Sequence, residues 1–134
     1  MGVQVTPSAY PVGGRFGAAF GDVAKTSLRF DPLAFRDELT ARRQALIEGL
    51  AGIPQLHWTP TGGGFFALVR VAGCTDSAAL ANDILERAHV VTIPGSIFGA
   101  SGEGFIRLSY SAVTQEAIGE ATCRLRRFFE ERRV

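Results

Sequence analysis

The stretch FIRLSY, residues 105–110, restricts the possible folds more than any other part of the sequence. Its apolar residues Ile106, Leu108 and Tyr110 recur at every second position, and alternate side chains of a strand point to opposite faces. The stretch therefore predicts a β-strand in a sheet with one buried face. Such a sheet needs helices or a second sheet to cover that face.

Arg107 falls on the other face of this predicted strand, between Phe105 and Ser109. The pattern alone leaves two interpretations open. A strand arginine commonly faces solvent or pairs with a neighbouring carboxylate. Alternatively, Arg107 binds an anionic ligand, because a guanidinium stays charged and offers planar donors that match a carboxylate with two parallel hydrogen bonds. Composition and spacing do not choose between the two.

Composition limits the class of protein. The 134 residues are 46% hydrophobic and 20% charged, which is typical of one globular domain. The formal net charge of +1 and the lack of a long apolar run predict neither nucleic-acid binding nor membrane association. Cys74 and Cys123 match no metal or redox spacing, and two lone thiols without a secretory signal favour the cytoplasm. His57 and His89 have no partner at ligand spacing, so no metal site is expected.

The hydrophobic periodicity predicts three helices in residues 31–134. Asp31 as the cap and Pro32 at the first helical position begin a helix that ends near Gly52. A second helix is capped by one of the residues 75–77 and runs to about residue 88, and a third spans about residues 114–131.

Four strands are expected between these helices. They are residues 56–59, 64–71, 90–92 and the FIRLSY stretch, with the third broken by Pro94-Gly95. Residues 64–71, GFFALVRV, are expected to be mostly buried because aromatic and β-branched residues dominate them. The order α-ββ-α-ββ-α predicts an α/β, two-layer α+β-like fold with a small mixed or antiparallel sheet and helices on one face. Residues 1–30 are expected to be an irregular Gly-rich segment before a domain at 31–134.

No complete set of catalytic residues can be assembled from local motifs. Serine, histidine and aspartate are present, but none lies in a Gly-x-Ser-x-Gly context, so no catalytic residue is predicted. The glycines of residues 95–104 lack the ending of a phosphate loop and precede a strand, whereas a dinucleotide fingerprint precedes a helix. Glycine-dense loops usually just turn the chain.

Several motifs taken together carry a more specific signal. Pro94-Gly95-Ser96 is followed by Phe98-Gly99, and Gly102-Glu103-Gly104 leads into the arginine strand. Upstream, PTGGGFF at residues 60–66 is a turn followed by two aromatic residues. In this order the motifs closely resemble the C-terminal region of class I/II aminotransferases, pyridoxal-phosphate enzymes of fold type I. The resemblance covers about residues 31–131.

The resemblance implies a role for this region. In the family it is the small domain, an α/β unit that closes over the substrate. The strand arginine binds the α-carboxylate of an amino acid or keto acid, a role that would fall to Arg107. The two loops approach the mouth of the active site, which makes Gly64, Phe65 and Phe98 candidate substrate-binding residues. Closure would exclude water and position the substrate.

The lysine to which the family attaches its cofactor has no counterpart in this sequence. Lys25 is the only lysine and lacks the family's serine-lysine context. Gly13-Gly14-Arg15-Phe16-Gly17 resembles the family motif whose arginine holds the cofactor phosphate, so Arg15 is a candidate cofactor-binding residue. A chain of 134 residues does not hold the family's large domain. We expect pyridoxal phosphate in the complete enzyme and none bound by this chain alone, which would then be inactive by itself.

Two functional hypotheses follow. The first is an aminotransferase-like small domain that binds the substrate carboxylate and closes the active site, with a large-domain polypeptide or a second copy of the chain as candidate partner. The second is a non-enzymatic α/β module that binds a small carboxylate or a protein partner. The sequence does not reveal which amino acid is handled.

Overall fold

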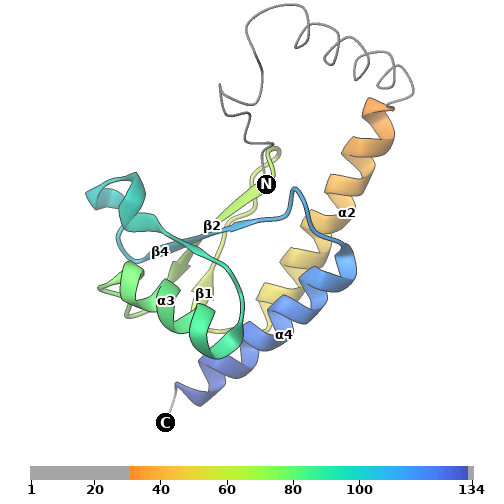
Figure 1. The fold of residues 1–134 in the computed structure, drawn as a ribbon. Helices are drawn as coiled ribbons and strands as arrows, with labels where there is room; N and C mark the ends of the chain where they lie inside the picture. The colour runs from red at the N-terminus through yellow and green to blue at the C-terminus, as the bar shows by residue number, and fades with distance from the viewer. Residues whose placement is uncertain (1–30, 133–134) are drawn as a thin grey trace, which may run out of the picture. The chain divides into compact units, whose positions relative to one another are not determined.

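The computed structural model describes residues 31–132 (Figure 1). Contacts divide the chain into two units, residues 1–38 and residues 39–134, and the arrangement given below is that of the second unit. In chain order the elements are α2 (Pro32–Ala51), β1 (Leu56–His57), β2 (Phe66–Val71), α3 (Ser77–Ala88), β3 (Ile93–Pro94), the 3-10 helices η1 (Gly95–Phe98) and η2 (Ala100–Gly102), β4 (Phe105–Ser109) and α4 (Gln115–Glu131).

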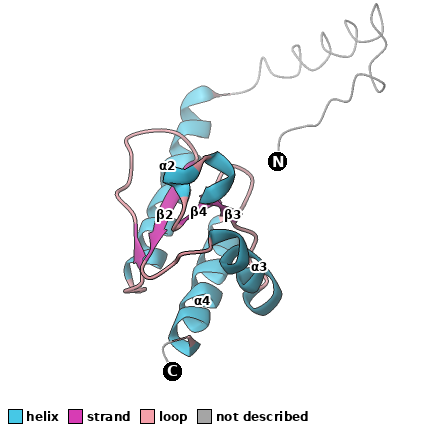
Figure 2. Ribbon diagram, turned by 90° about the vertical axis from the view of Figure 1, so that its left-hand side faces the viewer, coloured by secondary structure: helices cyan, strands magenta, loops and turns pink. Residues whose placement is uncertain are grey.

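The four strands form one antiparallel sheet in the order β1-β2-β4-β3. The longer strands β2 and β4 lie in the centre, and each edge is a strand of only two residues (Figure 2). The register places Arg107 of β4 opposite Leu68 of β2 on one side and Ile93 of β3 on the other. The predicted small antiparallel sheet is confirmed.

Helices cover one face of the sheet. The inward residues of β2 and β4 pack in a single apolar cluster with α3, α4 and the part of α2 from Leu39 onward. The cluster includes Leu46, Leu50, Ala67, Val69, Val71, Leu80, Ile84, Ile106, Leu108, Ile118, Leu125, Phe128 and Phe129. The other face carries the outward residues of the two central strands. The predicted two-layer arrangement with helices on one side is therefore confirmed.

The starts of α2 and α3 agree with the capping signals in the sequence, and α4 is capped in the same way. The side chains of Asp31, Asp76 and Thr114 each accept a hydrogen bond from a backbone amide two or three residues further on. Such bonds satisfy amides that have no partner within the first turn of a helix. Among the described residues, no helix is long and apolar enough to cross a membrane.

Helices α2 and α4 approach closely at Gly49. A Cβ atom at this position would lie 2.4 Å from Oγ1 of Thr122 in α4. The Thr122 side chain is buried, and its hydroxyl donates a hydrogen bond of 3.0 Å to the carbonyl of Ile118, so it has little freedom to move away. Glycine at this position therefore sets the distance between the two helices.

Two expectations about the strands are wrong. Residues 66–71 alternate between exposed and buried side chains and are not mostly buried, because helices cover only one face of β2. The third strand is Ile93–Pro94, and residues 90–92 are not a strand. Pro94 fits in β3 because β3 is an edge strand, where a residue without an amide hydrogen is tolerated.

Candidate functional site: an arginine between two aromatic rings

Arg107 lies in the middle of β4 on the face of the sheet that carries no helix. Its guanidinium carbon is 4.3 Å from the ring centroid of Phe66 on β2 and 5.0 Å from that of Phe98 in η1. A cation over an aromatic face is attracted by the ring's quadrupole, so the two rings hold the guanidinium in place.

The guanidinium of Arg107 has no polar partner within residues 31–132. The structure shows no ion pair for it with these residues, and its Nε–H is buried without a hydrogen-bond acceptor. Arg107 therefore does not pair with a neighbouring carboxylate of the described residues, which was one of the possibilities left open by the sequence. A guanidinium that is fixed by stacking keeps its in-plane donors available, and a planar anion such as a carboxylate matches them.

A cavity of about 370 Å³ opens beside Arg107. Its lining residues are Trp58, Thr59, Thr61, Phe66, Leu68, Gly95, Phe98, Gly102 and Arg107. Arg107 is the only charged side chain in this lining. The cavity thus combines one cation with mainly aromatic and aliphatic walls, which is a common composition for a small-molecule site.

The candidate residues inferred from the sequence do not all meet in this cavity. Arg107 and Phe98 line it together, whereas Phe65 is not in the lining and packs beside Phe66, with ring centroids 4.4 Å apart. Gly64 adopts a left-handed conformation with φ 81°, and its carbonyl accepts a hydrogen bond of 2.8 Å from the Tyr110 hydroxyl. Gly64 therefore shapes the turn before β2 and is not in the cavity lining.

Sequence reasoning missed Phe66 and Trp58. Phe66 lies on the same face as Arg107 because of the register between the antiparallel strands β2 and β4, and the sequence does not distinguish this register from one shifted by a residue. Trp58 follows a strand of two residues, and its place in the cavity depends on the path of the loop after β1. No pattern in the sequence indicates that path.

The loop that carries Phe98 is closely packed at two glycines. A Cβ atom on Gly95 would lie 2.0 Å from the carbonyl oxygen of Gly102, and a Cβ on Gly102 would lie 2.0 Å from that of Gly95. Only glycine permits this approach at either position. The glycines of the Pro-Gly and Gly-Glu-Gly motifs therefore do more than turn the chain.

Glu103 joins this loop to the start of α3. One oxygen of its carboxylate accepts hydrogen bonds from the backbone amides of Gly104 at 2.9 Å and Ser77 at 2.6 Å. These two amides, that of Gly104 first, lower the pKa of Glu103 because they favour the charged form. Glu103 is thus a charged hydrogen-bond acceptor with a structural role. A carboxyl group with a lowered pKa is not suited to donate a proton.

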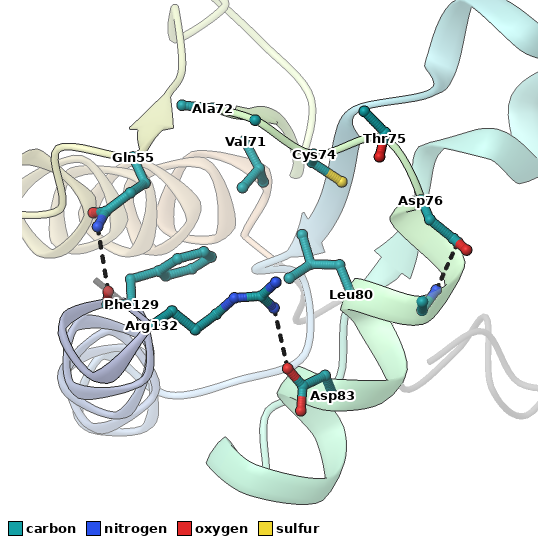
Figure 3. A pocket seen from close by; sticks show the side chains of 12 residues that line it. Gln55, Val71, Ala72, Cys74, Thr75, Asp76, Leu80, Asp83, Phe129 and Arg132 are labelled. Atoms are coloured by element: carbon teal, nitrogen blue, oxygen red, sulfur yellow. Dashed lines mark hydrogen bonds and ion pairs between the residues drawn. The ribbon is translucent and has the colours of Figure 1, made fainter. Parts of the chain in front are cut away.

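A second cavity, of about 540 Å³, lies at the end of β2 near the start of α3 (Figure 3). It contains none of the residues predicted as site residues. Cys74 lines it, and burial is the main cause that raises the pKa of its thiol, which makes the thiol a poor nucleophile. Arg132, which follows the last residue of α4, forms an ion pair with Asp83 of α3 at 3.0 Å.

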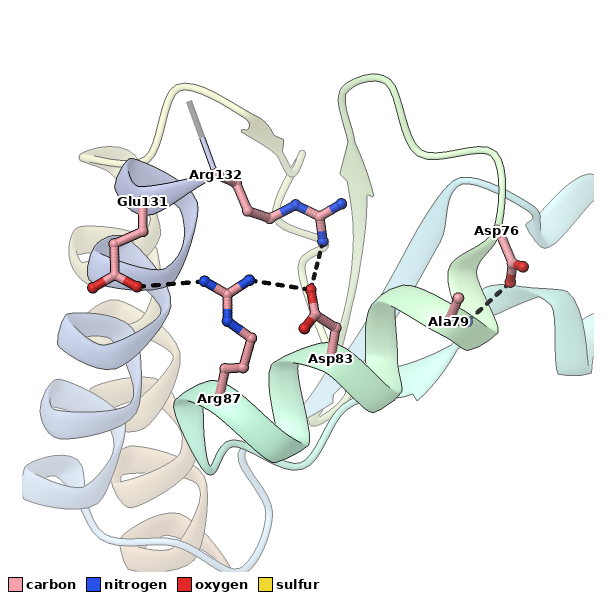
Figure 4. Close-up of polar contacts among 6 residues, drawn as sticks. All are labelled: Asp76, Ala79, Asp83, Arg87, Glu131 and Arg132. Carbon is pink, nitrogen blue, oxygen red and sulfur yellow. Dashed lines mark hydrogen bonds and ion pairs between the residues drawn. The ribbon is translucent and has the colours of Figure 1, made fainter. Parts of the chain in front are cut away.

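The ion pairs around this second cavity tie α3 to α4 (Figure 4). Arg87 of α3 lies 3.5 Å from both Asp83 and Glu131, and Arg132 contacts Asp83. Arg87 and Arg132 also lie over the ring of Phe128, at 5.1 and 5.5 Å from its centroid. Each of these four side chains has a charged partner, so the cluster links α3 to the end of α4.

The described residues do not form a binding site for pyridoxal phosphate of the kind that the family uses. Residues 31–132 contain no lysine, and Arg15 and Lys25 lie outside the described part of the chain. The same residues contain no group of His, Cys, Asp and Glu that could hold a metal ion. The role of Arg15 in cofactor binding stays a prediction.

Comparison with known proteins places this arrangement in a family. The sequence profile for aminotransferase class I and II matches residues 18–125. An aspartate aminotransferase from Pyrococcus horikoshii is 32% identical over 96 residues, which are 71% of this chain and 24% of the relative. The chain thus spans about a quarter of the length of this relative.

Solved structures that resemble this chain are also aminotransferases. The structure of an aromatic aminotransferase from Pyrococcus horikoshii matches 73% of this chain and 26% of its own length, with a TM-score of 0.68 and 33% identity. LysN, an α-aminoadipate aminotransferase from Thermus thermophilus solved with N-(5'-phosphopyridoxyl)-L-leucine, matches 72% of this chain and 25% of its own length, with a TM-score of 0.64 and 29% identity. The chain therefore belongs to the class I and II aminotransferase family.

Proposed function

We propose that residues 31–134 are the small domain of an aminotransferase and that Arg107 binds the α-carboxylate of the amino acid or keto acid substrate. One observation carries the proposal: the Arg107 guanidinium contacts the rings of Phe66 and Phe98 at a cavity, with no carboxylate partner among the described residues. A bidentate contact would fix the position and the orientation of the substrate at once.

The proposed domain would act by positioning and by excluding water. The walls of the cavity are mainly aromatic and aliphatic, so closure over a substrate would remove water from the Arg107–carboxylate contact and strengthen it. This part of the chain would perform no proton transfer, because no free acid or base lines the cavity.

We infer that the complete enzyme uses pyridoxal phosphate, as the structure of LysN with a phosphopyridoxyl-leucine suggests by analogy. When bound, this cofactor supplies an electron sink for chemistry at the substrate's α-carbon. The described residues include no lysine to which it could be attached, so a large-domain polypeptide or a second copy of the chain is the proposed partner. Membership of the family gives no support to the alternative of a non-enzymatic module.

Nuclear magnetic resonance of the Arg107 Nε–H group tests the carboxylate site. The 134-residue chain would be titrated with pyruvate and, as the matched ligand without a carboxylate, with methyl pyruvate. We expect the Nε–H signal to shift with pyruvate only. If the chain alone shows no shift, the same titration with an aminotransferase large domain added tests the partner.

Arginine variants provide the second arm of the test. Arg107→Ala should abolish pyruvate binding, and Arg107→Lys should weaken it by about 1–3 kcal/mol because a lysine keeps the charge but loses the planar fork. Arg70→Ala is the matched control, because Arg70 lies on the same face of the sheet as Arg107 but is not in the cavity lining. Its guanidinium carbon lies 5.9 Å from the ring centroid of Phe105. Equal weakening by Arg70→Ala and Arg107→Ala would contradict the proposal.

A further inference from the structure

We infer that Ser77 and Glu103 are positioning residues that clamp the two ends of the loop at residues 95–104 to the start of α3 and thereby set Phe98 over Arg107. The inference concerns the geometry of the arginine site, and its importance for ligand binding rests on the proposed function. Neither Ser77 nor Glu103 lines the cavity, so any effect on ligand binding would be indirect.

The first arm of the clamp joins α3 to η1. The hydroxyl of Ser77 donates a hydrogen bond of 3.0 Å to Oγ of Ser96 and accepts one of 3.2 Å from the Ser96 amide. Ser77 is completely buried, so its hydroxyl has no competing water. Phe98, whose ring contacts the Arg107 guanidinium, is two residues beyond Ser96 in the same 3-10 helix.

The second arm joins α3 to the start of β4. The Glu103 carboxylate accepts the amide of Ser77 at 2.6 Å and the amide of Gly104 at 2.9 Å. Arg107 follows in β4, three residues after Gly104. A single residue, Ser77, therefore contacts the segment that carries the ring through its side chain and the segment that carries the guanidinium through its backbone.

Polar contacts matter here because the loop has no apolar anchor of its own. Within residues 95–104 the buried residues are glycines, and Ile97 and Phe98 are 67% and 53% exposed. A segment that buries few apolar side chains opens locally at low cost in free energy unless other bonds hold it. The close contact of Gly95 with Gly102 joins the two arms, and Ser77 fixes the pair to the rest of the domain.

The test compares variants at the start of α3 without any ligand. Ser77→Ala removes the contacts to Ser96, and Glu103→Gln removes the charge that the two amides favour. Asp76→Ala is the matched control, because Asp76 caps the same helix through the amide of Ala79 at 2.9 Å and makes no hydrogen bond to the loop. Thermal unfolding of each variant reports how much general stability is lost.

Two readouts separate positioning from general stability. We expect amide hydrogen exchange in residues 95–104 to rise about five- to hundredfold in Ser77→Ala, as the loss of two hydrogen bonds implies. Exchange should also rise in Glu103→Gln and should not change in Asp76→Ala. We expect the Arg107 Nε–H signal to shift in the first two variants only, because the Phe98 ring moves relative to it.

The outcomes keep this inference apart from the proposed function. Unchanged loop exchange and an unchanged Arg107 signal in folded Ser77→Ala would overturn the clamp, as would equal changes in Asp76→Ala. If Ser77→Ala does not fold, Ser96→Ala removes the hydroxyl contact from the loop side and is read in the same way. If pyruvate binds the wild-type chain neither alone nor with an aminotransferase large domain added, the proposed function is contradicted, whereas the result for the clamp is unaffected.

Discussion

Alanine at Gly102 should distort the loop beside Arg107. The new Cβ would lie 2.0 Å from the carbonyl oxygen of Gly95, whereas ordinary contact begins near 3.4 Å, so the two backbone segments must separate by about 1.4 Å. The clashing atom belongs to the backbone, so no side-chain rotation relieves it. Overpacking of this kind costs about 1–3 kcal/mol.

Gly63→Ala is the matched control. A Cβ at Gly63 meets nothing within 4 Å, and Gly63 does not have a positive φ. This substitution should leave the free energy of unfolding unchanged or raise it by about 0.4–1 kcal/mol, because alanine reduces the conformational freedom of the unfolded chain. The two variants therefore make the same chemical change with opposite expected signs.

Urea denaturation gives the free energies, and the emission of Trp58 gives the local effect. Trp58 is the only tryptophan, and it lines the same cavity as Gly102. We expect a lower unfolding midpoint and altered native-state emission in Gly102→Ala, and neither change in Gly63→Ala. Equal midpoints and equal native-state spectra for the two variants would refute the close-contact reasoning.

Three further predictions concern stability. In urea denaturation, the free energy of unfolding of Gly49→Ala should be about 1–3 kcal/mol lower than that of Gly119→Ala. Both substitutions raise helix propensity, but only the Cβ at position 49 clashes with Thr122; equal free energies would contradict this. Tyr110→Phe should lower the free energy of unfolding by about 1 kcal/mol, since the buried hydroxyl donates to Gly64, and an unchanged midpoint would count against that bond. The pKa of Glu103 is lowered on folding, so its stabilising contribution is complete above its ordinary value of 4.5 and is lost as the pH falls through the folded value. Unfolding midpoints from about pH 6 to about pH 3 should fall more steeply for the wild type than for Glu103→Gln, and parallel curves would exclude the effect.

Local signals in the sequence predicted the helices well. Asp31 and Asp76 accept the capping bonds expected at the starts of the first two helices, and α4 begins and ends within a residue of its expected bounds. These features depend on side chains that act on their own neighbours in the chain. The alternation in FIRLSY also holds, with Ile106 and Leu108 buried and Arg107 on the other face.

The register between strands was not predictable. Phe65 and Phe66 are adjacent and chemically identical, and a shift of one residue exchanges the faces of a strand. The observed register puts Phe66 next to Arg107 in the cavity and leaves Phe65 outside the cavity lining. The clamp at Ser77 was equally hidden, because its partners Ser96 and Glu103 lie 19 and 26 residues away in the chain.

The wrong expectation about β2 bears on the proposed function. Its outward residues Phe66 and Leu68 are apolar, which made the strand look buried on both faces, yet they are 41% and 47% exposed. A strand with this composition is typical of a sheet covered on both faces. The chain spans about a quarter of a relative's length, so under the proposed function this face would meet the substrate and the partner domain. Phe66 and Leu68 would then be covered in the closed, complete enzyme, as the sequence pattern of β2 predicts. Their exposure would be a property of the small domain without its partner.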